Sequence, residues 1–582
     1  MDPNSCDPDE CKQMCTKAHA DGQGLCTGKP HEVEKKSRNF TTSTRKKMHM
    51  VNWNTLCNPK DQGGLGLRAL EHYNQAFLMK MGWGIIIHKS NDLWAQVLRG
   101  KYACGNDIIP QVKSRMNSSN LWRGVSKVWH NVENNLCWRI GNGLKVNFWH
   151  DVWMHEYGPL KNHLLTEMRE DEIHYKAVQY SIASGDWDWA KFIHLLPDEI
   201  VKNIAGIQAP NEHAGEDMIF WGLTNDGNFS VKSAYHAIAG FRHENVGSHW
   251  KFIWKWPVIQ RVRSFLWLVA HERDITNLYR FNCNLSNSSL CPRCCNQVED
   301  VLHAIRDCPE IKKLWQRLVR PQHWNTFFNL NVTDWLIWNW KNRIGVLEDV
   351  NWRTTFGFTC WISWKHRNEV IFENSIANNT DLFFSVLCRG KEYASCNNNR
   401  LYGVQQARST KFIRWKPPRD DFVKCNVDGS VYEGKDAACG GLLRDAAGDF
   451  ITCFSSNLGR CSITVAELHA IQEGLKMAWD HGYRNIIMEV DSQIAIDLIQ
   501  KEINPLHPHC SIVKSIQHLM NRDWRVIFQH TYREGNGVAD FLAHWGHELG
   551  IGTHYMHELP SEGEQILADD RMGICFPRVC VV

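Results

Sequence analysis

Residues 422–450 alternate apolar and other side chains as a β-strand does, yet they carry an aspartate inside the run. Their sequence, FVKCNVDGSVYEGKDAACGGLLRDAAGDF, predicts a β-hairpin whose glycines permit close backbone approach. Asp428 stands where such a strand favours a β-branched apolar residue. A carboxylate at that place costs free energy unless it is solvated, paired or bound to a metal. The sequence therefore predicts that other elements supply partners for Asp428.

The chain beyond this hairpin continues as helix, strand, two helices, strand and helix, and the pattern ends near residue 548. This order predicts an α/β domain over residues 421–548, with a five-stranded mixed sheet flanked by helices. Three more acids fall at the ends of predicted elements: Glu467 in the first turn of a helix, Asp491 after the apolar run NIIMEV, and Asp540 on a helix with Asn536 as its predicted N-cap.

Each of these three acids also has a local explanation. Glu467 follows Thr464 in a Thr-x-x-Glu capping box, and Asp491 could cap the helix that follows it. Asp540 would suit the positive end of its helix. Asp428 has no such explanation, because it lies within a strand. Taken together, carboxylates that converge from separate elements suit a pair of divalent cations, which prefer oxygen ligands.

The motifs around these acids resemble those of a type 1 ribonuclease H domain, in the same order: NVDGS, GGLLRDAAGD, AELHAIQEGL, MEVDSQ and REGNGVADFLA. They closely resemble the plant retroelement-derived branch of that family. The resemblance implies an enzyme that hydrolyses the RNA strand of RNA–DNA hybrids endonucleolytically and leaves a 5′-phosphate. It also implies two magnesium or manganese ions, which activate a water and stabilise the leaving oxygen, held by Asp428, Glu467, Asp491 and Asp540.

The resemblance places His530 at the family's mobile histidine, which assists product release. A histidine that merely ends a strand is the alternative. The loop after it departs from the bacterial pattern, because Arg533 and Glu534 replace a glycine–histidine pair. The long basic handle of some family members is also missing, so the substrate must be gripped elsewhere on the chain.

A second constellation, CPRCCNQVEDVLHAIRDC, has the spacing C-x2-C-x8-H-x4-C. A Cys pair on a turn and a His–Cys pair on a helix can close a tetrahedron around one zinc ion, here through Cys291, Cys294, His303 and Cys308. Cys295 adjoins the first pair and is expected to point elsewhere. The alternative is a group of reduced, buried thiols beside a core histidine.

The flanks of this cluster, WKFIWKWPVIQRVRSFLWLVAHERDITNLYRF and CPEIKKLW, resemble the reverse-transcriptase zinc-binding domain of plant non-long-terminal-repeat retroelements. The upstream segments VNWNTLCNPKDQGGLGLR and FWHDVW resemble the region that follows such a polymerase. The resemblance implies a nucleic-acid-binding module. Basic residues among aromatics agree with it, although the basic outer face of a core helix explains them equally well: Lys251, Lys255, Arg261, Arg263 and Arg273.

Length and composition complete the expected organisation. A chain of 582 residues predicts several domains, and its 27 tryptophans are concentrated before residue 370. The expected division is a disordered, basic and cysteine-containing leader (1–50), a post-polymerase connection of helices and hairpins (51–230), a mainly α zinc-binding domain (231–320), a helical segment and linker (321–420), the ribonuclease H domain (421–548) and a C-terminal tail (549–582). The two expected hairpins turn at Asn142-Gly143 and at Asp226-Gly227.

Other features restrict the function. No Tyr/Phe-x-Asp-Asp polymerase motif occurs, so DNA synthesis is not expected. No secretory signal and no bilayer-length apolar run is found, so the 22 cysteines are expected to be reduced, in the nucleus or cytoplasm, without a membrane partner. The sequence thus predicts a hybrid-cleaving ribonuclease joined to a zinc-binding module. The alternatives are a catalytically inactive nucleic-acid-binding remnant of a retroelement and a scaffold whose tryptophan-rich half binds protein.

Overall fold

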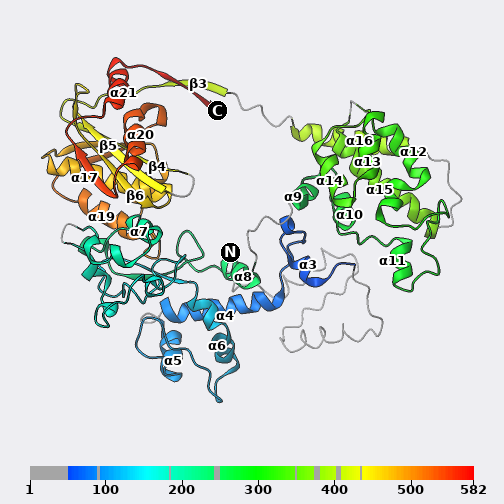
Figure 1. Cartoon of the computed structure of the whole chain (residues 1–582), viewed down its shortest axis with the longest axis horizontal. Coiled ribbons are helices and arrows are strands. Elements are labelled where there is room, and N and C mark those ends of the chain that lie inside the picture. Colours follow the sequence, from blue (N-terminus) through cyan, green and yellow to red (C-terminus); the bar gives the residue numbers. More distant parts are fainter. Residues whose placement is uncertain are drawn as a thin grey trace, which may run out of the picture. The chain divides into compact units, whose positions relative to one another are not determined.

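The computed structural model places the chain in helices and strands that gather into two units (Figure 1). The first unit comprises Met1–Leu67 and Asn245–Ser395, and the second comprises Arg68–Glu244 and Cys396–Val582. The structure describes residues 50–87, 92–182, 185–240, 249–347, 350–372, 381–401, 408–432 and 436–581. The expected leader, residues 1–50, lies outside the described residues except for its last residue.

The described part of the first unit is built from helices, as the mainly α prediction required. They are α3 (Trp53–Cys57), α9 (His249–Lys255), α10 (Gln260–Ala270), α11 (Asn277–Asn282), α12 (Pro309–Leu318), α13 (Trp324–Asn329), α14 (Val332–Lys341), α15 (Trp352–Phe372) and α16 (Leu382–Leu401), with shorter turns between them. Their buried faces are rich in tryptophan, whose indole nitrogen favours an acceptor. Trp256 donates to the Arg353 carbonyl at 2.6 Å, and Trp315 donates to the Ile305 carbonyl at 2.8 Å.

The N-terminal part of the second unit is also mainly helical. Its elements are α4 (Leu70–Ile87), α5 (Leu93–Lys101), α6 (Asn120–Glu133), β1 (Leu136–Arg139), α7 (Asp198–Ala205), β2 (Met218–Trp221) and α8 (Val231–Ala239), with several short 3-10 turns. Among the described helices of the whole chain, none combines the length and hydropathy that a bilayer-spanning segment requires.

The two predicted hairpins do not form. Strands β1 and β2, one from each predicted hairpin, pair antiparallel with each other instead. The Asn142-Gly143 turn wraps around the buried carboxylate of Asp217, which accepts hydrogen bonds from the amides of Gly141, Gly143, Lys145 and Val146. Because these amides satisfy Asp217, they are not available to pair with a neighbouring strand.

The α/β domain is a mixed sheet between two layers of helices. Its strand order is β8 (Arg525–His530), β7 (Asn485–Val490), β4 (Val423–Val431), β5 (Asp436–Arg444), β6 (Phe450–Arg460) and β9 (Gly552–Met556), in which β4, β7 and β8 are parallel. Successive side chains of β5 point to opposite faces. Leu443 packs with α17 (Ile463–Asp480), α18 (Gln493–Gln500) and α19 (Cys510–Met520), whereas Leu442 packs with α20 (Gly537–Trp545) and α21 (Ser561–Met572).

This sheet has six strands, so the prediction of five is wrong. The added strand β9 comes from the expected tail and pairs antiparallel with β6. It covers the edge of a long strand whose N–H and C=O groups would otherwise lack partners. Its sequence, GTHYM, has no alternating apolar pattern that could reveal a strand. The tail continues through α21 to β10 (Phe576–Val581), which pairs with β3 (Arg408–Ile413).

Candidate functional site

Three of the four predicted acids meet at one edge of the sheet. Asp428 lies in the middle of β4, Glu467 lies near the start of α17, and Asp491 directly follows β7, which runs parallel to β4. Gly429 lets α17 approach the strand, since a Cβ on it would lie 2.8 Å from the backbone nitrogen of Glu467. One carboxylate oxygen from each acid lies within 4.8 Å of the others. We refer to Asp428, Glu467 and Asp491 as the acid cluster.

The local explanations for two of these acids do not hold. Helix α17 is capped by Ser462, whose side chain accepts a hydrogen bond from an amide of the first turn, so Thr464 is not a capping residue. Helix α18 is capped in the same way by Ser492, the residue after Asp491. Neither Glu467 nor Asp491 therefore caps a helix. Their positions are explained by the acid cluster itself.

The acid cluster is electrostatically unfavourable as three bare anions. Asp428 and Glu467 are each only 4% exposed. Burial, reinforced by the charges of the neighbouring acids, raises the pKa of Asp428 to about 10 and also raises the pKa of Glu467. Among the described residues, Oε2 of Glu467 finds no hydrogen-bond partner. A buried, unpartnered carboxylate oxygen in such a cluster fits a hard divalent cation.

The fourth predicted acid, Asp540, lies in the first turn of α20 and outside the group of three. Burial is the main cause of the raised pKa of Asp491, and the charge of Asp540 adds to it, so the fourth acid is electrostatically coupled to the cluster. Oδ1 of Asp540 accepts hydrogen bonds from Nε and Nη2 of Arg533, at 2.9 and 2.5 Å. Arg533 therefore neutralises Asp540 beside the cluster.

His530 ends β8 next to the acid cluster. It stands opposite Val490, the residue before Asp491, in the parallel register of β7 and β8. Its Nε2 lies 3.1 Å from the backbone carbonyl oxygen of Asp491. The side chain is exposed. Its part in product release stays a prediction.

The four predicted zinc ligands lie together in the first unit. The Sγ atoms of Cys291 and Cys308 are 3.8 Å apart, and Sγ of Cys294 is 3.4 Å from Nε2 of His303. One ligand atom from each of the four residues lies within 4.8 Å of the others. Cys295 is exposed and lies outside this group, as expected. We call the four residues the cysteine–histidine cluster.

His303 and Cys308 face the same side because the helix between them is widened. Residues His303–Asp307 form a π-helical turn, in which the Cys308 amide donates to the His303 carbonyl at 3.0 Å. Hydrogen bonding from Cys308 lowers the pKa of Cys291 to about 2, and His303 adds to this effect against the opposing effect of burial. A thiolate at Cys291 is the form in which a cysteine binds a metal.

Comparisons with known proteins match both sites. Residues 229–315 match the family described as zinc-binding in reverse transcriptase, and residues 426–546 match the family described as reverse transcriptase-like. An Arabidopsis thaliana protein named "Putative ribonuclease H protein" is 32% identical over 560 residues, which cover 94% of this chain and 89% of the relative. The chain belongs to this family of retroelement-derived plant ribonuclease H proteins.

Further similarities are shorter. An Arabidopsis thaliana protein named "Uncharacterized mitochondrial protein" is 32% identical over 117 residues, which cover 20% of this chain and 75% of that relative. A solved ribonuclease H domain from Mycobacterium tuberculosis covers 22% of this chain and 94% of its own, with 21% identity and a TM-score of 0.21. Ribonuclease H1 from Halobacterium salinarum covers 22% of this chain and 98% of its own, with 23% identity and a TM-score of 0.20.

A buried polar network braces the strand of the ribonuclease H-like domain that carries the first cluster acid. Lys424 and Asn426 alternate along the same face of β4. Lys424 Nζ lies 3.1 Å from Oε1 of Glu489, and the Asn426 amide donates to Oε2 of the same residue at 2.7 Å. Arg444 donates at 2.8 Å both to Asn426 and to Asp570 of α21. The expected tail therefore supports the centre of this domain.

Asn536 also belongs to this network. It precedes α20 as predicted, but its side chain does not cap the helix. Its amide nitrogen donates to the Val427 carbonyl at 2.9 Å, and its oxygen accepts from Asn426 at 3.0 Å. Asn536 therefore ties the loop that carries Arg533 to β4. This network is not among the predictions from the sequence, although the polar residues that alternate on one face of β4 are a signal for it.

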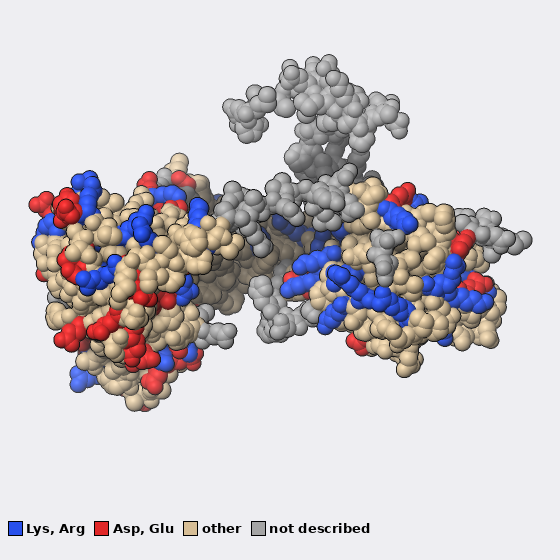
Figure 2. Space-filling model, turned by 90° about the horizontal axis from the view of Figure 1, so that it is seen from above, with Lys and Arg blue, Asp and Glu red and all other residues tan. Residues whose placement is uncertain are grey.

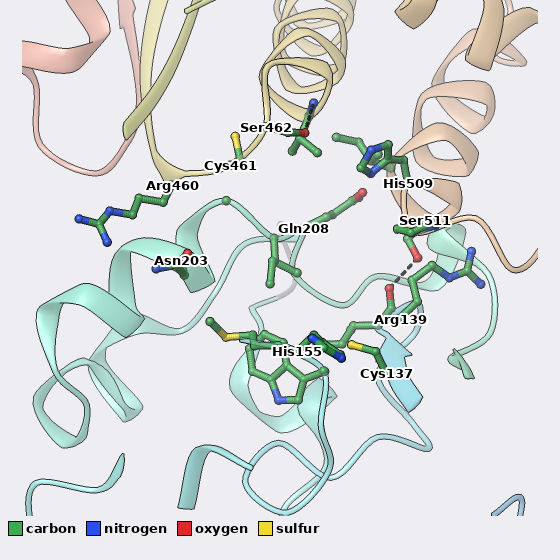
Figure 3. A pocket seen from close by; sticks show the side chains of 18 of the residues that line it. Cys137, Arg139, His155, Asn203, Gln208, Arg460, Cys461, Ser462, His509 and Ser511 are labelled. Atoms are coloured by element: carbon green, nitrogen blue, oxygen red, sulfur yellow. Dashed lines mark hydrogen bonds between the residues drawn. The ribbon is translucent and has the colours of Figure 1, made fainter. Parts of the chain in front are cut away.

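A cavity of about 560 Å³ lies in the second unit, between its N-terminal part and the ribonuclease H-like domain (Figure 3). Residues from both parts line it, among them Cys137, Arg139, His155, Asn203, Gln208, Arg460, Cys461, Ser462, His509 and Ser511. Burial lowers the pKa of His509 to about 4, so this side chain is neutral at neutral pH. None of the lining residues is a predicted ligand or catalytic acid, and the cavity is separate from both clusters.

Proposed function

We propose that this protein hydrolyses the RNA strand of RNA–DNA hybrids at the acid cluster. The observation that carries the proposal is the convergence of three carboxylates, two buried and one half-buried, from β4, α17 and the end of β7. Their pKa values are raised and Oε2 of Glu467 has no partner among the described residues, so a cation at this place would stabilise the ionised carboxylates. The name of the Arabidopsis relative supports the same reaction class.

The residues that would hold two magnesium or manganese ions are the acid cluster and Asp540. When bound, such ions supply an activated water and stabilise the leaving oxygen of an in-line displacement. The chain's own residues provide the oxygen ligands, and the network of Lys424, Asn426 and Glu489 keeps β4 in position beneath them. Selection of the RNA strand would rest on contacts with 2′-hydroxyl groups.

We further propose that the cysteine–histidine cluster binds one zinc ion. Three of its four residues are buried, and the thiolate form of Cys291 is favoured. Thiolate and imidazole ligands in this number are typical of closed, structural zinc sites. Free thiols require a reducing compartment, which agrees with the nucleus or the cytoplasm.

The second candidate function is a catalytically inactive, nucleic-acid-binding remnant of a retroelement. One observation favours it. Arg533 donates two hydrogen bonds to Asp540, so a protein side chain neutralises the fourth acid that the reaction would use. The two candidate functions differ in whether the full chain turns over a hybrid.

A cleavage assay with the full chain tests the proposal. With magnesium, we expect cuts within the labelled RNA strand of an RNA–DNA hybrid and products that carry a 5′-phosphate. Single-stranded RNA and duplex DNA of the same sequence should stay intact, because only a hybrid presents 2′-hydroxyls on one strand of a duplex. Absence of cleavage at any divalent-cation concentration would favour the inactive remnant.

We expect the substitution Arg533→Gln to strengthen divalent-cation binding, because it removes the counter-charge on Asp540. A partly exposed ion pair contributes up to about 1 kcal/mol, which corresponds to roughly fivefold in affinity. Isothermal titration with Mn²⁺, without nucleic acid, measures this change directly. Arg460→Gln is the control, because it breaks ion pairs with Asp436 and Glu199, which lie outside the acid cluster. Equal Mn²⁺ affinity in the two variants would show that Arg533 does not compete for Asp540.

A further inference from the structure

Two segments of the first unit are basic and contain no acid. Residues 245–271, which form α9 and α10, have no Asp or Glu, and neither do residues 335–347, which end α14. The cations of interest are Lys251 and Lys255 on α9, Lys341 and Arg343 at the end of α14, and Arg353 at the start of α15. We call these five residues the basic face.

Aromatic packing brings the basic face together from segments about a hundred residues apart. Phe252 of α9 stacks on Trp340 of α14, with ring centroids 5.2 Å apart. The Arg353 guanidinium lies 4.1 Å from the centroid of the same indole, and its Nε donates to the Trp340 carbonyl at 2.7 Å. The lysines of α9 and the cations that flank Trp340 therefore share one surface. Figure 2 shows Lys and Arg gathered over a face of this unit.

Among the described residues, the exposed charges of the basic face have no carboxylate partner in an ion pair. Lys251, Lys255, Lys341 and Arg343 are exposed, and Arg353 is half-buried. Burial lowers the pKa of Arg353, and the nearby charge of Arg343 lowers it further. Within the described residues, no ion pair involves any of the five.

Several other exposed cations of the same unit do have a carboxylate partner. Arg317 pairs with Asp381 at 3.0 Å, and Arg389 pairs with Glu392 at 3.0 Å. Gathered like charges repel one another and weaken the folded state. A surface that concentrates cations unpaired with any described carboxylate is suited to a polyanion, because binding the polyanion relieves this repulsion.

We propose that the basic face binds the sugar–phosphate backbone of nucleic acid, independently of base sequence. Lysine is a flexible point charge that suits phosphate oxygens rather than base edges. The two stacked aromatics cover each other, so they support the cations instead of inserting into a bilayer or reading a base. The basic face would hold the substrate in place of the long basic handle segment, which the ribonuclease H-like domain lacks. That last role rests on the proposed function, whereas backbone binding does not.

The basic face should affect the affinity for a hybrid and not the rate of the chemical step. A nucleic acid held by the basic face stays at a high effective concentration near the other unit of the same chain. Loss of the basic face should therefore raise KM for a hybrid and leave kcat unchanged, because the face supplies none of the carboxylates proposed to act on the reacting phosphate.

The test compares two charge-reversed forms of the full chain. The first carries Lys251→Glu, Lys255→Glu and Lys341→Glu on the basic face. The second is a matched control with Lys312→Glu, Lys313→Glu and Lys391→Glu, three exposed lysines on α12 and α16. Both forms have the same net charge. Fluorescence anisotropy with a labelled hybrid, in magnesium-free buffer over a range of salt concentrations, reports binding without cleavage.

We expect the first form to bind about tenfold or more weakly than the control. The slope of log affinity against log salt should become shallower by about 2 to 3, because each lost phosphate contact removes about 0.9. Two hybrids of unrelated sequence should lose affinity equally. Equal hybrid affinity and equal salt slope in the two triple variants would overturn the proposal. It would also be overturned if the basic-face variant kept its affinity for the hybrid and lost affinity only for anionic vesicles or for an acidic protein. If the wild type binds through this face but never cleaves, only the proposed function fails.

Discussion

Asp428→Asn should abolish magnesium-dependent cleavage of a hybrid while leaving the chain folded. The amide cannot replace a charged oxygen ligand between Glu467 and Asp491, so the loss should amount to several kcal/mol of transition-state stabilisation, or about a thousandfold or more in rate. Asparagine has nearly the same shape as aspartate, and it removes a carboxyl group whose ionisation is unfavourable in this cluster. The cation-free variant should therefore be as stable as the wild type, or more stable.

The same substitution should change how stability depends on pH. Asp428 has a pKa raised to about 10 in the folded state, whereas an aspartate in an unfolded chain has its ordinary pKa of 3.8. The folded cation-free protein thus binds more protons between these values, and its stability falls as pH rises through that window. By pH 7 the contribution of Asp428 to this loss should be roughly 2–4 kcal/mol in the wild type. Asp428→Asn should lack this contribution and keep that of Glu467, whose pKa is also raised by burial.

Thermal unfolding with and without magnesium, together with hybrid cleavage, measures both effects. Asp523→Asn is a matched control on an exposed turn of the same domain, and it should change neither. Cleavage at the wild-type rate by Asp428→Asn would exclude the acid cluster as the catalytic site. A variant that is less stable than the wild type at every pH would show that Asp428 is a structural residue.

Cys291→Ser combined with Cys294→Ser should abolish the proposed zinc binding and unfold the surrounding part of the first unit. These residues hold the loop against the π-helical turn at His303, and the closest sulfur pair joins Cys291 to Cys308. Structural zinc sites contribute on the order of 10 kcal/mol or more to folding in small domains, so few other contacts could compensate. Helical content and thermal stability should both fall markedly.

Metal analysis of the purified chain should find about one zinc per molecule in the wild type and none in the double variant. Cys295→Ser provides the control, because this exposed thiol lies next to the pair but outside the cluster. It should retain full zinc content and stability. A wild type without zinc, or a double variant that keeps it, would mean that the cluster is only a group of packed thiols.

The sequence shows local properties of the chain, whereas the tertiary structure shows contacts between residues that are far apart in the sequence. The sequence by itself determined which residues are chemically costly where they stand, such as Asp428 in a strand, and which spacing suits a metal, such as the four cysteine–histidine ligands. It also determined the order of strands and helices around Glu467 and Asp491, because apolar periodicity is a local property of the chain.

Only the tertiary structure decided which segments meet. The pairing of β1 with β2, the edge strand β9 and the bond from Arg444 to Asp570 all join residues far apart in the chain. No local pattern selects such a partner, because many strands offer equivalent N–H and C=O groups and many carboxylates could satisfy one arginine. The same reason explains why the sequence could single out Arg533 and Asp540 separately but could not show that they pair. An ion pair is chosen by the packing of the loops that carry it.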